Sequence, residues 1–367
     1  SKVTLSWMSG WDDTECSFSI VENGETIYES SDLQEGVFAE YVAAGNKGCV
    51  TPENLTLELL GDKVELSWTT FVETDNFAIL RNDEVIAENV KTNNYIDTEI
   101  PASGTYSYSV KSMTADCMSN PSNVVSVSVM KNNYNELTVE ASLTDNNVTL
   151  EWNQPAANGV LKYGTDLYLT NEGSPTHNWG IVIPAEILTS FNHNDISSVE
   201  IYDACEADYT FKIYNGTTPH DSILLYEETF TATNSNSFVK FDLAEKVSFD
   251  ITKDLWIVAK GSKSKSIPCG EYLGEPNSCM IKSGVTWKPA TEYNLPYSWL
   301  LRAYTSSSEE LNDALTYNIY RDNAMIASEL TEPSYVDNNV DGKVYYKVEA
   351  VCDSTVVVTS EEVCVDA

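Results

Sequence analysis

The segment that decides the fold is Val148-Thr-Leu-Glu-Trp152, in which apolar and polar side chains alternate as in a half-buried β-strand. A closely similar segment, Val64-Glu-Leu-Ser-Trp68, is followed almost at once by a second apolar strand, Phe77-Ala-Ile-Leu-Arg81. After Trp152 the matching second strand does not begin until Tyr317. The chain therefore contains the same repeat twice, and the second copy is split by an insertion long enough to form a domain.

The two copies agree well beyond their first strands. Turns rich in Asn, Asp and Gly separate alternating segments in both. This pattern predicts an all-β protein of tandem fibronectin type III or immunoglobulin-like sandwiches, with Trp68 and Trp152 in their cores. The matched pairs are Phe77 and Tyr317, Arg81 and Arg321, Ile86 and Ile326, Tyr95 and Tyr335, Asp97 and Asp337, Tyr108 and Tyr346, Val110 and Val348, and Cys117 and Cys352.

These repeats divide the chain into four predicted parts. In the first part, alternating segments and the pair Asn23-Gly24 predict a β-hairpin. Two interpretations of that part stay open, a truncated repeat and a separate small β domain. The four parts are residues 1–48, a fibronectin type III-like domain at 49–131, a split domain of the same kind at 132–155 and 313–367, and the insertion at 156–312.

Charge is the unusual feature of the composition. The chain has 56 acidic and 21 basic residues and a formal net charge of −35. The acidic residues are dispersed, which indicates a solvated surface that repels nucleic-acid phosphates and anionic lipid headgroups. We therefore expect no nucleic-acid partner. No apolar run is long enough to span a membrane and no signal peptide is recognisable, so secretion requires a targeting segment that was removed or lies outside this sequence.

Eight cysteines indicate an oxidising compartment. Some pairs are suggested by local spacing or by their positions at the two ends of a repeat, although some cysteines can instead be buried thiols. No spacing typical of a thiolate zinc site occurs. The candidate disulfides are Cys352 with Cys364, Cys269 with Cys279, and Cys49 with Cys117, whereas Cys16 and Cys205 stay unassigned.

The insertion consists mainly of strand-like segments, which predict a jelly-roll-like β-sandwich. Four of its aromatic residues lie near turn-rich or proline-bounded stretches: Trp179, Trp287, Tyr293 and Tyr297. Rings on loops at the end of a sandwich can stack on sugar rings, so these four are the predicted ligand surface. The alternative is that the rings pack over the edge of the sandwich.

Three carboxylates, Asp203, Glu206 and Asp208, surround Cys205 in a short connection between strands. Carboxylates grouped in a loop can bind calcium, but the spacing of an EF-hand is absent, which favours a solvated acidic turn. No cofactor is firmly implied, and calcium is the one that these residues suggest. No nucleophile elbow, zinc-protease helix, Walker loop or dinucleotide fingerprint occurs, so no catalytic residue is predicted.

The split repeat also carries family motifs. They are Tyr317-x-Ile319-Tyr320-Arg321-Asp322, Leu330-Thr331-Glu332, Asp337, Tyr346-x-Val348, and Cys352 with Cys364. This pattern resembles repeats in the haemagglutinin/adhesin regions of gingipains and the adhesin tails of related secreted thiol proteases of anaerobic bacteria. The resemblance covers residues 310–367 and, less closely, 49–155. It implies fibronectin-like repeats that alternate with jelly-roll modules in a secreted setting, and none of the family's protease motifs occurs here.

The leading hypothesis is a non-catalytic, secreted or cell-surface adhesin-like segment that binds host or matrix proteins or glycans. In it the repeats act as spacers and the insertion presents the binding surface. It would belong to the C-terminal region of a secreted protease. One alternative is a carbohydrate-binding accessory module of a secreted hydrolase. Another is that the insertion itself is an enzyme.

Overall fold

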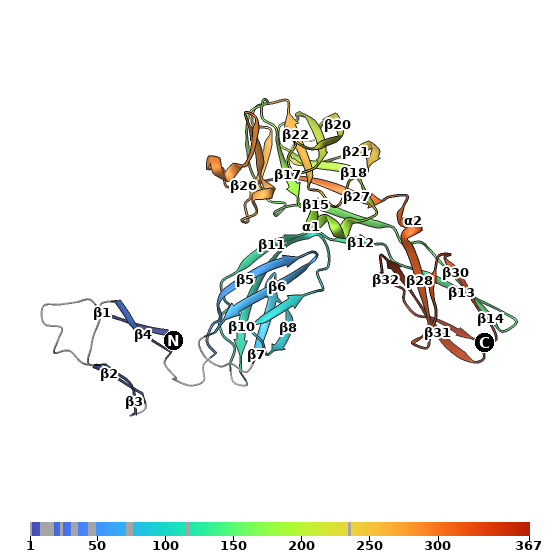
Figure 1. The fold of residues 1–367 in the computed structure, drawn as a ribbon, viewed down its shortest axis with the longest axis horizontal. Coiled ribbons are helices and arrows are strands. Elements are labelled where there is room, and N and C mark those ends of the chain that lie inside the picture. The colour runs from blue at the N-terminus through green and yellow to red at the C-terminus, as the bar shows by residue number, and fades with distance from the viewer. Residues whose placement is uncertain are drawn as a thin grey trace. The chain divides into compact units, whose positions relative to one another are not determined.

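The computed structural model describes the strands 2–7, 18–22, 25–30 and 36–42 and the segments 49–70, 76–114, 117–233 and 236–367 (Figure 1). The described chain is built almost entirely of β-strands, as the sequence predicts. It divides into two compact units, one of Ser1–Thr98 with Tyr106–Val127 and the other of Glu99–Thr105 with Ser128–Ala367. No helix among these residues has the length and apolar character needed to cross a bilayer.

The N-terminal part forms two antiparallel strand pairs. Strand β1 (Lys2–Trp7) pairs with β4 (Gly36–Val42), and β2 (Phe18–Glu22) pairs with β3 (Glu25–Ser30). The pairing of β2 with β3 confirms the predicted hairpin, although Asn23, Gly24 and Cys16 lie outside the described residues.

The first full repeat is a sandwich of two sheets. Trp68 lies in its core, where its ring meets that of Phe77 edge-on at 5.1 Å. One sheet has the order β5-β6-β9 and the other the order β11-β10-β7-β8. The bounds are β5 (Glu53–Leu60), β6 (Lys63–Thr69), β7 (Asn76–Arg81), β8 (Glu84–Val90), β9 (Asn94–Asp97), β10 (Gly104–Met113) and β11 (Val125–Val129).

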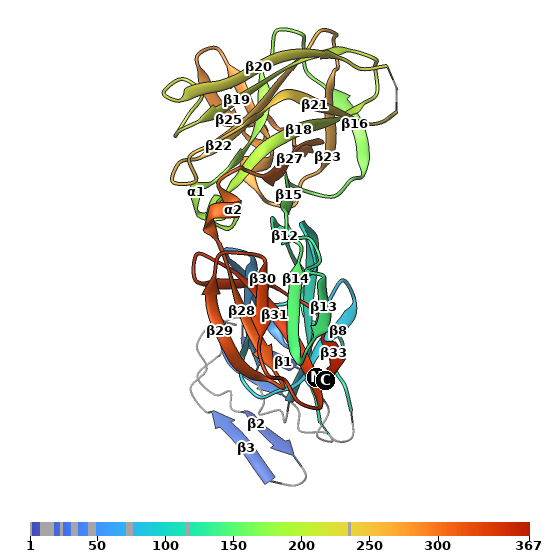
Figure 2. The ribbon, with the colours of Figure 1, turned by 90° about the vertical axis from the view of Figure 1, so that its right-hand side faces the viewer.

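The split repeat has the same strand order, which confirms the fibronectin type III-like architecture (Figure 2). Trp152 and Tyr317 meet edge-on at 5.2 Å in one core, although the insertion separates them in sequence. The sheets are β13-β14-β30 and β29-β28-β31-β32, with β33 also paired to β31. The bounds are β13 (Val139–Thr144), β14 (Asn147–Trp152), β28 (Leu315–Arg321), β29 (Ala324–Leu330), β30 (Ser334–Asp337), β31 (Lys343–Cys352), β32 (Thr355–Thr359) and β33 (Val363–Asp366).

Three polar residues that the two repeats share, an arginine, an aspartate and a tyrosine, hydrogen-bond to one another in each copy. In each copy a buried aspartate accepts hydrogen bonds from the arginine and from the tyrosine hydroxyl. Because these groups come from three different strands, they tie the two sheets together. In the first repeat, Asp97 Oδ2 lies 2.7 Å from Arg81 and 2.8 Å from the Tyr108 hydroxyl. In the split repeat, Asp337 Oδ2 lies 2.8 Å from both Arg321 and the Tyr346 hydroxyl.

The insertion is a β-sandwich of two large sheets, as predicted, with a small third sheet β16-β23-β26. The buried ring of Phe211 in its core contacts two half-buried rings, Phe230 and Phe241, each at 5.9 Å. The larger sheets have the orders β12-β15-β27-β18-β21 and β20-β19-β22-β17-β24-β25. The bounds are β12 (Asn132–Tyr134), β15 (Ala157–Lys162), β16 (Tyr168–Glu172), β17 (Trp179–Ile183), β18 (Asn194–Asp203), β19 (Asp208–Asn215), β20 (Ile223–Thr231), β21 (Ser237–Val247), β22 (Leu255–Gly261), β23 (Ile267–Glu271), β24 (Met280–Ser283), β25 (Thr286–Pro289), β26 (Tyr297–Trp299) and β27 (Leu301–Ser307).

Short helical segments connect several of these strands. The helix α1 (Ala185–Leu188) follows β17, and η2 (Thr189–Phe191) precedes β18. The segments η3 (Pro276–Ser278), η4 (Ala290–Tyr293) and α2 (Leu311–Ala314) complete the set. One strand crosses the expected boundary, because β12, predicted to belong to the split repeat, pairs with β15 of the insertion.

Candidate functional site

A hollow of about 710 Å³ lies on the insertion where three loops meet. The first loop leads into β18, the second follows β21, and the third follows β27. Most of the side chains around it are polar. They are Asn192, His193, Asn194, Asp195, Lys246, Ser248, Phe249, Asp250, Ile251, Ser308, Glu309 and Glu310. We call this feature the loop hollow.

Asn215, the last residue of β19, holds the middle loop in shape. Its side chain is 5% exposed, and its amide nitrogen donates to the carbonyl oxygens of Asp250, Lys253 and Asp254 at 3.2, 3.2 and 3.1 Å. Its amide oxygen accepts a hydrogen bond of 2.7 Å from the backbone nitrogen of Asp250. One buried side chain thus binds both ends of the segment 250–254, so the wall of the hollow that includes Asp250 is fixed before any ligand arrives.

The floor of the loop hollow is also held by internal hydrogen bonds. Asn194 is buried, and its amide nitrogen donates to Asn132 Oδ1 at 2.8 Å and to Thr305 Oγ1 at 3.0 Å. Asp195 accepts a hydrogen bond of 2.8 Å from the Ser248 hydroxyl. The hydrogen bond between Asp195 and Ser248 joins the start of β18 to the loop after β21. The polar groups of the site are therefore preorganised rather than dependent on a ligand for their positions.

The loop hollow is acidic. Asp195, Asp250, Glu309 and Glu310 line it, against the single lysine Lys246. Hydrogen bonds from Lys253 and then from Thr252 lower the pKa of Asp250 below its usual range, so this carboxylate is charged at neutral pH. Such a lining repels anionic ligands and accepts neutral or cationic ones.

The loop after β21 also borders two smaller hollows of about 370 Å³ each. One of them shares Ser248, Phe249 and Asp250 with the loop hollow. Phe249 is half-buried and lines both hollows. The loop after β21 therefore borders neighbouring depressions and contributes an aromatic residue beside several hydrogen-bonding groups.

Removal of the Asn215 side chain should loosen this loop. An Asn215→Ala variant is expected to lower the free energy of unfolding of the insertion by about 2–3 kcal/mol, because it leaves the backbone amide of Asp250 and three carbonyls without this buried partner. Denaturant unfolding of the full chain measures this change. Asn158→Ala, at an exposed amide, is the matched control and should change stability by about 0.5 kcal/mol or less. Equal effects of the two variants would refute this role of Asn215.

The structure places Trp179 in the core, so the prediction that it belongs to a ligand surface is wrong. Its side chain is 0% exposed, and its ring meets Trp299 edge-on at 6.3 Å. The physical reason is the position of β17, which lies between β22 and β24 in the middle of a six-stranded sheet. A large ring on the inner face of a central strand is covered by the opposite sheet.

The other three predicted aromatics lie on three different elements. Trp287, on β25, packs edge-on against the buried Trp256 at 5.4 Å and is half-buried. Tyr293 is 40% exposed on η4, and Tyr297 begins β26 in the small sheet. Trp287 is therefore partly a packing residue, as the alternative interpretation predicts, and Tyr293 is the most exposed ring of the set.

The carboxylate of Asp203 has a structural role. It is completely buried and accepts hydrogen bonds from the backbone nitrogens of Cys205 and Glu206 and from the Tyr209 hydroxyl, the last at 2.9 Å. Its oxygens are therefore used within its own loop. Asp208 accepts from Thr231, and within the described part of the chain these carboxylates do not converge as a cluster of metal ligands. The calcium interpretation gains no support from this geometry.

One predicted disulfide forms and two do not. Cys49 and Cys117 are bonded, with Cα atoms 5.8 Å apart. Cys352 ends β31, whereas Cys364 lies opposite Tyr345 near the start of that strand. At a rise of about 3.3 Å per residue the two cysteines are roughly 20 Å apart, which is too far for a disulfide. Cys269 and Cys279 are both buried thiols, and burial raises their pKa values. They belong to different sheets, because β23 carries the first and the second directly precedes β24.

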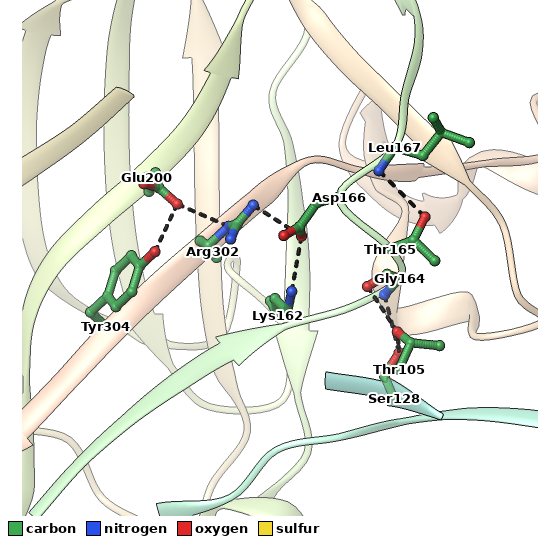
Figure 3. A network of polar contacts seen from close by, with 10 residues as sticks. All are labelled: Thr105, Ser128, Lys162, Gly164, Thr165, Asp166, Leu167, Glu200, Arg302 and Tyr304. Atoms are coloured by element: carbon green, nitrogen blue, oxygen red, sulfur yellow. Dashed lines mark hydrogen bonds and ion pairs between the residues drawn. The ribbon is translucent and has the colours of Figure 1, made fainter. Parts of the chain in front are cut away.

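A second polar surface, absent from the sequence predictions, covers the outer face of β18 and β27 (Figure 3). Arg302 is only 9% exposed and bonds Glu200 at 3.0 Å and Asp166 at 3.2 Å. Lys162 bonds Asp166 at 2.9 Å, and the Tyr304 hydroxyl donates to Glu200 at 2.8 Å. Because Arg302 alternates with buried Leu301 and Ala303, the network lies on the face away from the core. We call it the outer sheet face.

Aromatic rings continue the outer sheet face. Tyr168 stacks on Tyr202 at 4.5 Å, and Phe238 meets Tyr202 edge-on at 5.3 Å. The guanidinium of Arg302 lies 3.8 Å from the centre of the Phe238 ring, and the Lys240 ammonium lies 3.9 Å from that of Tyr304. The rings thus already pack against one another and against cations.

The comparisons with known proteins found weak likenesses to solved structures. No family model matches the chain, and no curated protein matches it. Among solved structures, a chitinase from Bacillus thuringiensis is 11% identical with a TM-score of 0.20, over 59% of this chain and 27% of that one. Fibronectin(III)-like modules from Clostridium thermocellum are 11% identical with a TM-score of 0.18, over 85% of this chain and 91% of theirs.

A surface layer associated protein of Clostridium difficile, solved as its cysteine protease and lectin-like domains, is also similar. It is 11% identical with a TM-score of 0.27, over 67% of this chain and 46% of that one. The first two structures found are matched over only 20% and 27% of their own lengths. Likenesses this weak carry no argument about ligand or activity, which must come from the residues of this chain.

Proposed function

We propose that the chain is a non-catalytic, adhesin-like segment of a secreted or cell-surface protein and that the loop hollow binds a neutral glycan. In this proposal the fibronectin type III-like repeats are scaffold, and the inserted sandwich supplies the binding site. The observation that carries the proposal is the loop hollow itself, a preorganised polar depression beside the ring of Phe249.

The chemistry of the lining suits a sugar. A glycan presents many hydroxyl groups, which donate and accept hydrogen bonds, and apolar C–H faces, which pack on aromatic rings. The loop hollow offers amide, carboxylate, hydroxyl and ammonium groups near one half-buried phenyl ring. Its four carboxylates disfavour sulfated or sialylated glycans, so the ligand class proposed is uncharged or amino-bearing.

Two features support an extracellular setting. The disulfide between Cys49 and Cys117 suits an oxidising compartment. The motifs of the split repeat, from Tyr317 to Cys364, resemble the adhesin regions of gingipains and related secreted proteases. We therefore propose that the segment accompanies a secreted protease and attaches it to glycans of a host or matrix surface.

A glycan array followed by calorimetric titration of the full chain tests the proposal. Saturable binding of a neutral glycan is expected, and Phe249→Ala should raise its Kd roughly tenfold, which corresponds to about 1.4 kcal/mol. The matched control is Tyr293→Ala, which removes an exposed ring outside the loop hollow and should leave the Kd unchanged. Absence of glycan binding, or an equal loss in both variants, would contradict the proposal.

The outer sheet face favours a second candidate, adhesion to a protein. Tyrosine and other aromatic side chains contribute strongly to the energetics of protein interfaces, and the half-buried Tyr304 and Phe238 are held in place there. A Lys240→Ala variant distinguishes the two candidates, because its side chain is exposed on this face. Binding to matrix proteins that is lost in Lys240→Ala and kept in Phe249→Ala would favour the protein partner.

A further inference from the structure

Three side chains capable of binding a metal ion meet in the second compact unit. His193, Cys352 and Asp353 each place one ligand atom so that all three atoms lie within 4.8 Å of one another. His193 Nε2 is 3.2 Å from Asp353 Oδ2. His193 comes from the loop before β18 of the insertion, and the other two residues come from the end of β31 in the split repeat and the turn that follows it.

The position of Cys352 differs from that of the disulfide in the first repeat. Ser112 pairs with Phe77 on β7, and Ala350 pairs with the matching Tyr317 on β28. Thr114 lies two residues after Ser112, and Cys352 lies two residues after Ala350. By strand register, Cys352 therefore corresponds to Thr114 and not to Cys117. In the first repeat the hydroxyl of Thr114 touches both sulfurs of the disulfide. In the split repeat a thiol stands at this edge, with no disulfide beside it.

The thiol of Cys352 is instead surrounded by polar groups. The Tyr134 hydroxyl, on β12, hydrogen-bonds to it, and His193 and Asp353 lie beside it. Cys352 itself is buried, at 5% exposure. The Asn192 amide nitrogen lies 2.8 Å from Asp353 Oδ2 and 3.0 Å from His193 Nε2, so in this structure it hydrogen-bonds to two of the three candidate ligand atoms and holds them in place.

We propose that His193, Cys352 and Asp353 form a zinc site that joins the insertion to the split repeat. An imidazole nitrogen, a thiolate and a carboxylate oxygen are the three ligand types that zinc accepts together, whereas calcium and magnesium reject sulfur. In a tetrahedral zinc site the ligand atoms stand about 3.3–3.8 Å apart, a separation that the observed cluster reaches with shifts of roughly 1 Å. Water fills the fourth position, since Asp353 is exposed.

Zinc bound here would brace the loop hollow, because His193 also lines that depression. The site would tie the loop before β18 to the turn after β31. The strongly acidic surface raises the local concentration of divalent cations and so assists entry of the metal. The zinc site does not depend on the proposed glycan function, since its evidence is the ligand cluster alone.

Metal titration of the full chain, with the Cys49–Cys117 disulfide intact, tests the proposal. One equivalent of zinc is expected to bind, and cobalt in its place should show the absorption band of a thiolate–cobalt bond together with the visible bands of tetrahedral cobalt. Cys352→Ser should abolish the thiolate band, and His193→Ala should weaken zinc binding at least about tenfold. Thermal unfolding should shift upward with zinc in the wild-type chain and stay constant in both variants.

Matched controls come from the same chain. Cys364→Ser removes an exposed thiol and His220→Ala an exposed imidazole, and neither residue belongs to the cluster. Both controls should keep the cobalt spectrum and the zinc affinity of the wild-type chain. Asp353→Asn, a conservative change in an exposed turn, should fold normally and bind zinc more weakly. Absence of stoichiometric zinc binding, or a cobalt–thiolate band that survives in Cys352→Ser, would overturn the proposal.

Discussion

An Asp97→Ala variant is expected to lose about 3–5 kcal/mol of unfolding free energy in the first full repeat, the usual loss when one partner of a buried ion pair is removed. Asp97 is 2% exposed and accepts hydrogen bonds from Arg81 and from the Tyr108 hydroxyl, which the variant leaves without their acceptor. The equivalent Asp337→Ala should cost the split repeat less, because Arg321 is 37% exposed whereas Arg81 is 18% exposed.

Guanidinium unfolding of the full chain, followed by tryptophan fluorescence, measures both losses as separate transitions. Glu88→Ala is the control, since this carboxylate is exposed on β8, and its effect should stay within about 0.5 kcal/mol. A loss below 1 kcal/mol in Asp97→Ala would mean that the repeated arginine, aspartate and tyrosine do not hold the two sheets together.

The second large effect is expected for Trp179→Ala, which should destabilise the insertion by about 3–5 kcal/mol. Its ring is wholly buried against Trp299, so the substitution opens a cavity in the core. Trp287→Ala removes a half-buried ring from the edge strand β25 and should cost only about 1–2 kcal/mol. Differential scanning calorimetry of the two variants measures the difference.

This pair of variants also guards against a false assignment of the ligand site. Loss of binding in Trp179→Ala would reflect an unfolded insertion rather than a lost contact with the ligand. A Trp179→Ala chain that melts like the wild type would contradict the core position of Trp179. A Trp287→Ala chain that unfolds as easily as Trp179→Ala would show that the contact of Trp287 with Trp256 contributes as much stability as the core position of Trp179.

The fold of the repeats could be predicted from sequence because one intact copy gave the order in which the strands of the split copy must join. Trp68 and Trp152 follow the same alternating strand, and Phe77 and Tyr317 are their matched partners in the core. A period of two in sequence fixes which side chains face inward, whatever length of chain separates two strands. The hairpin between β2 and β3 was likewise predictable from local turn residues.

The candidate site could not be predicted, because it depends on contacts between residues distant in sequence. Asn215 stabilises the loop at 250–254 through its amide group, and nothing in the segments around either one signals that contact. Trp179 was assigned to a surface from the turn-rich stretch before it, although burial depends on the place of β17 within its sheet. The short sequence spacing of Cys352 and Cys364 suggested a disulfide, whereas the register of β31 with β33 places the two residues far apart.

Hydrogen exchange of the full chain, with and without the neutral glycan that binds most strongly, tests whether the loop hollow is the binding site. The ligand is expected to protect backbone amides at 192–195, 246–251 and 308–310, around the loop hollow, and to leave the two repeats unchanged. Protection confined to β18 and β27 on the outer sheet face, or to the strands of either repeat, would contradict it.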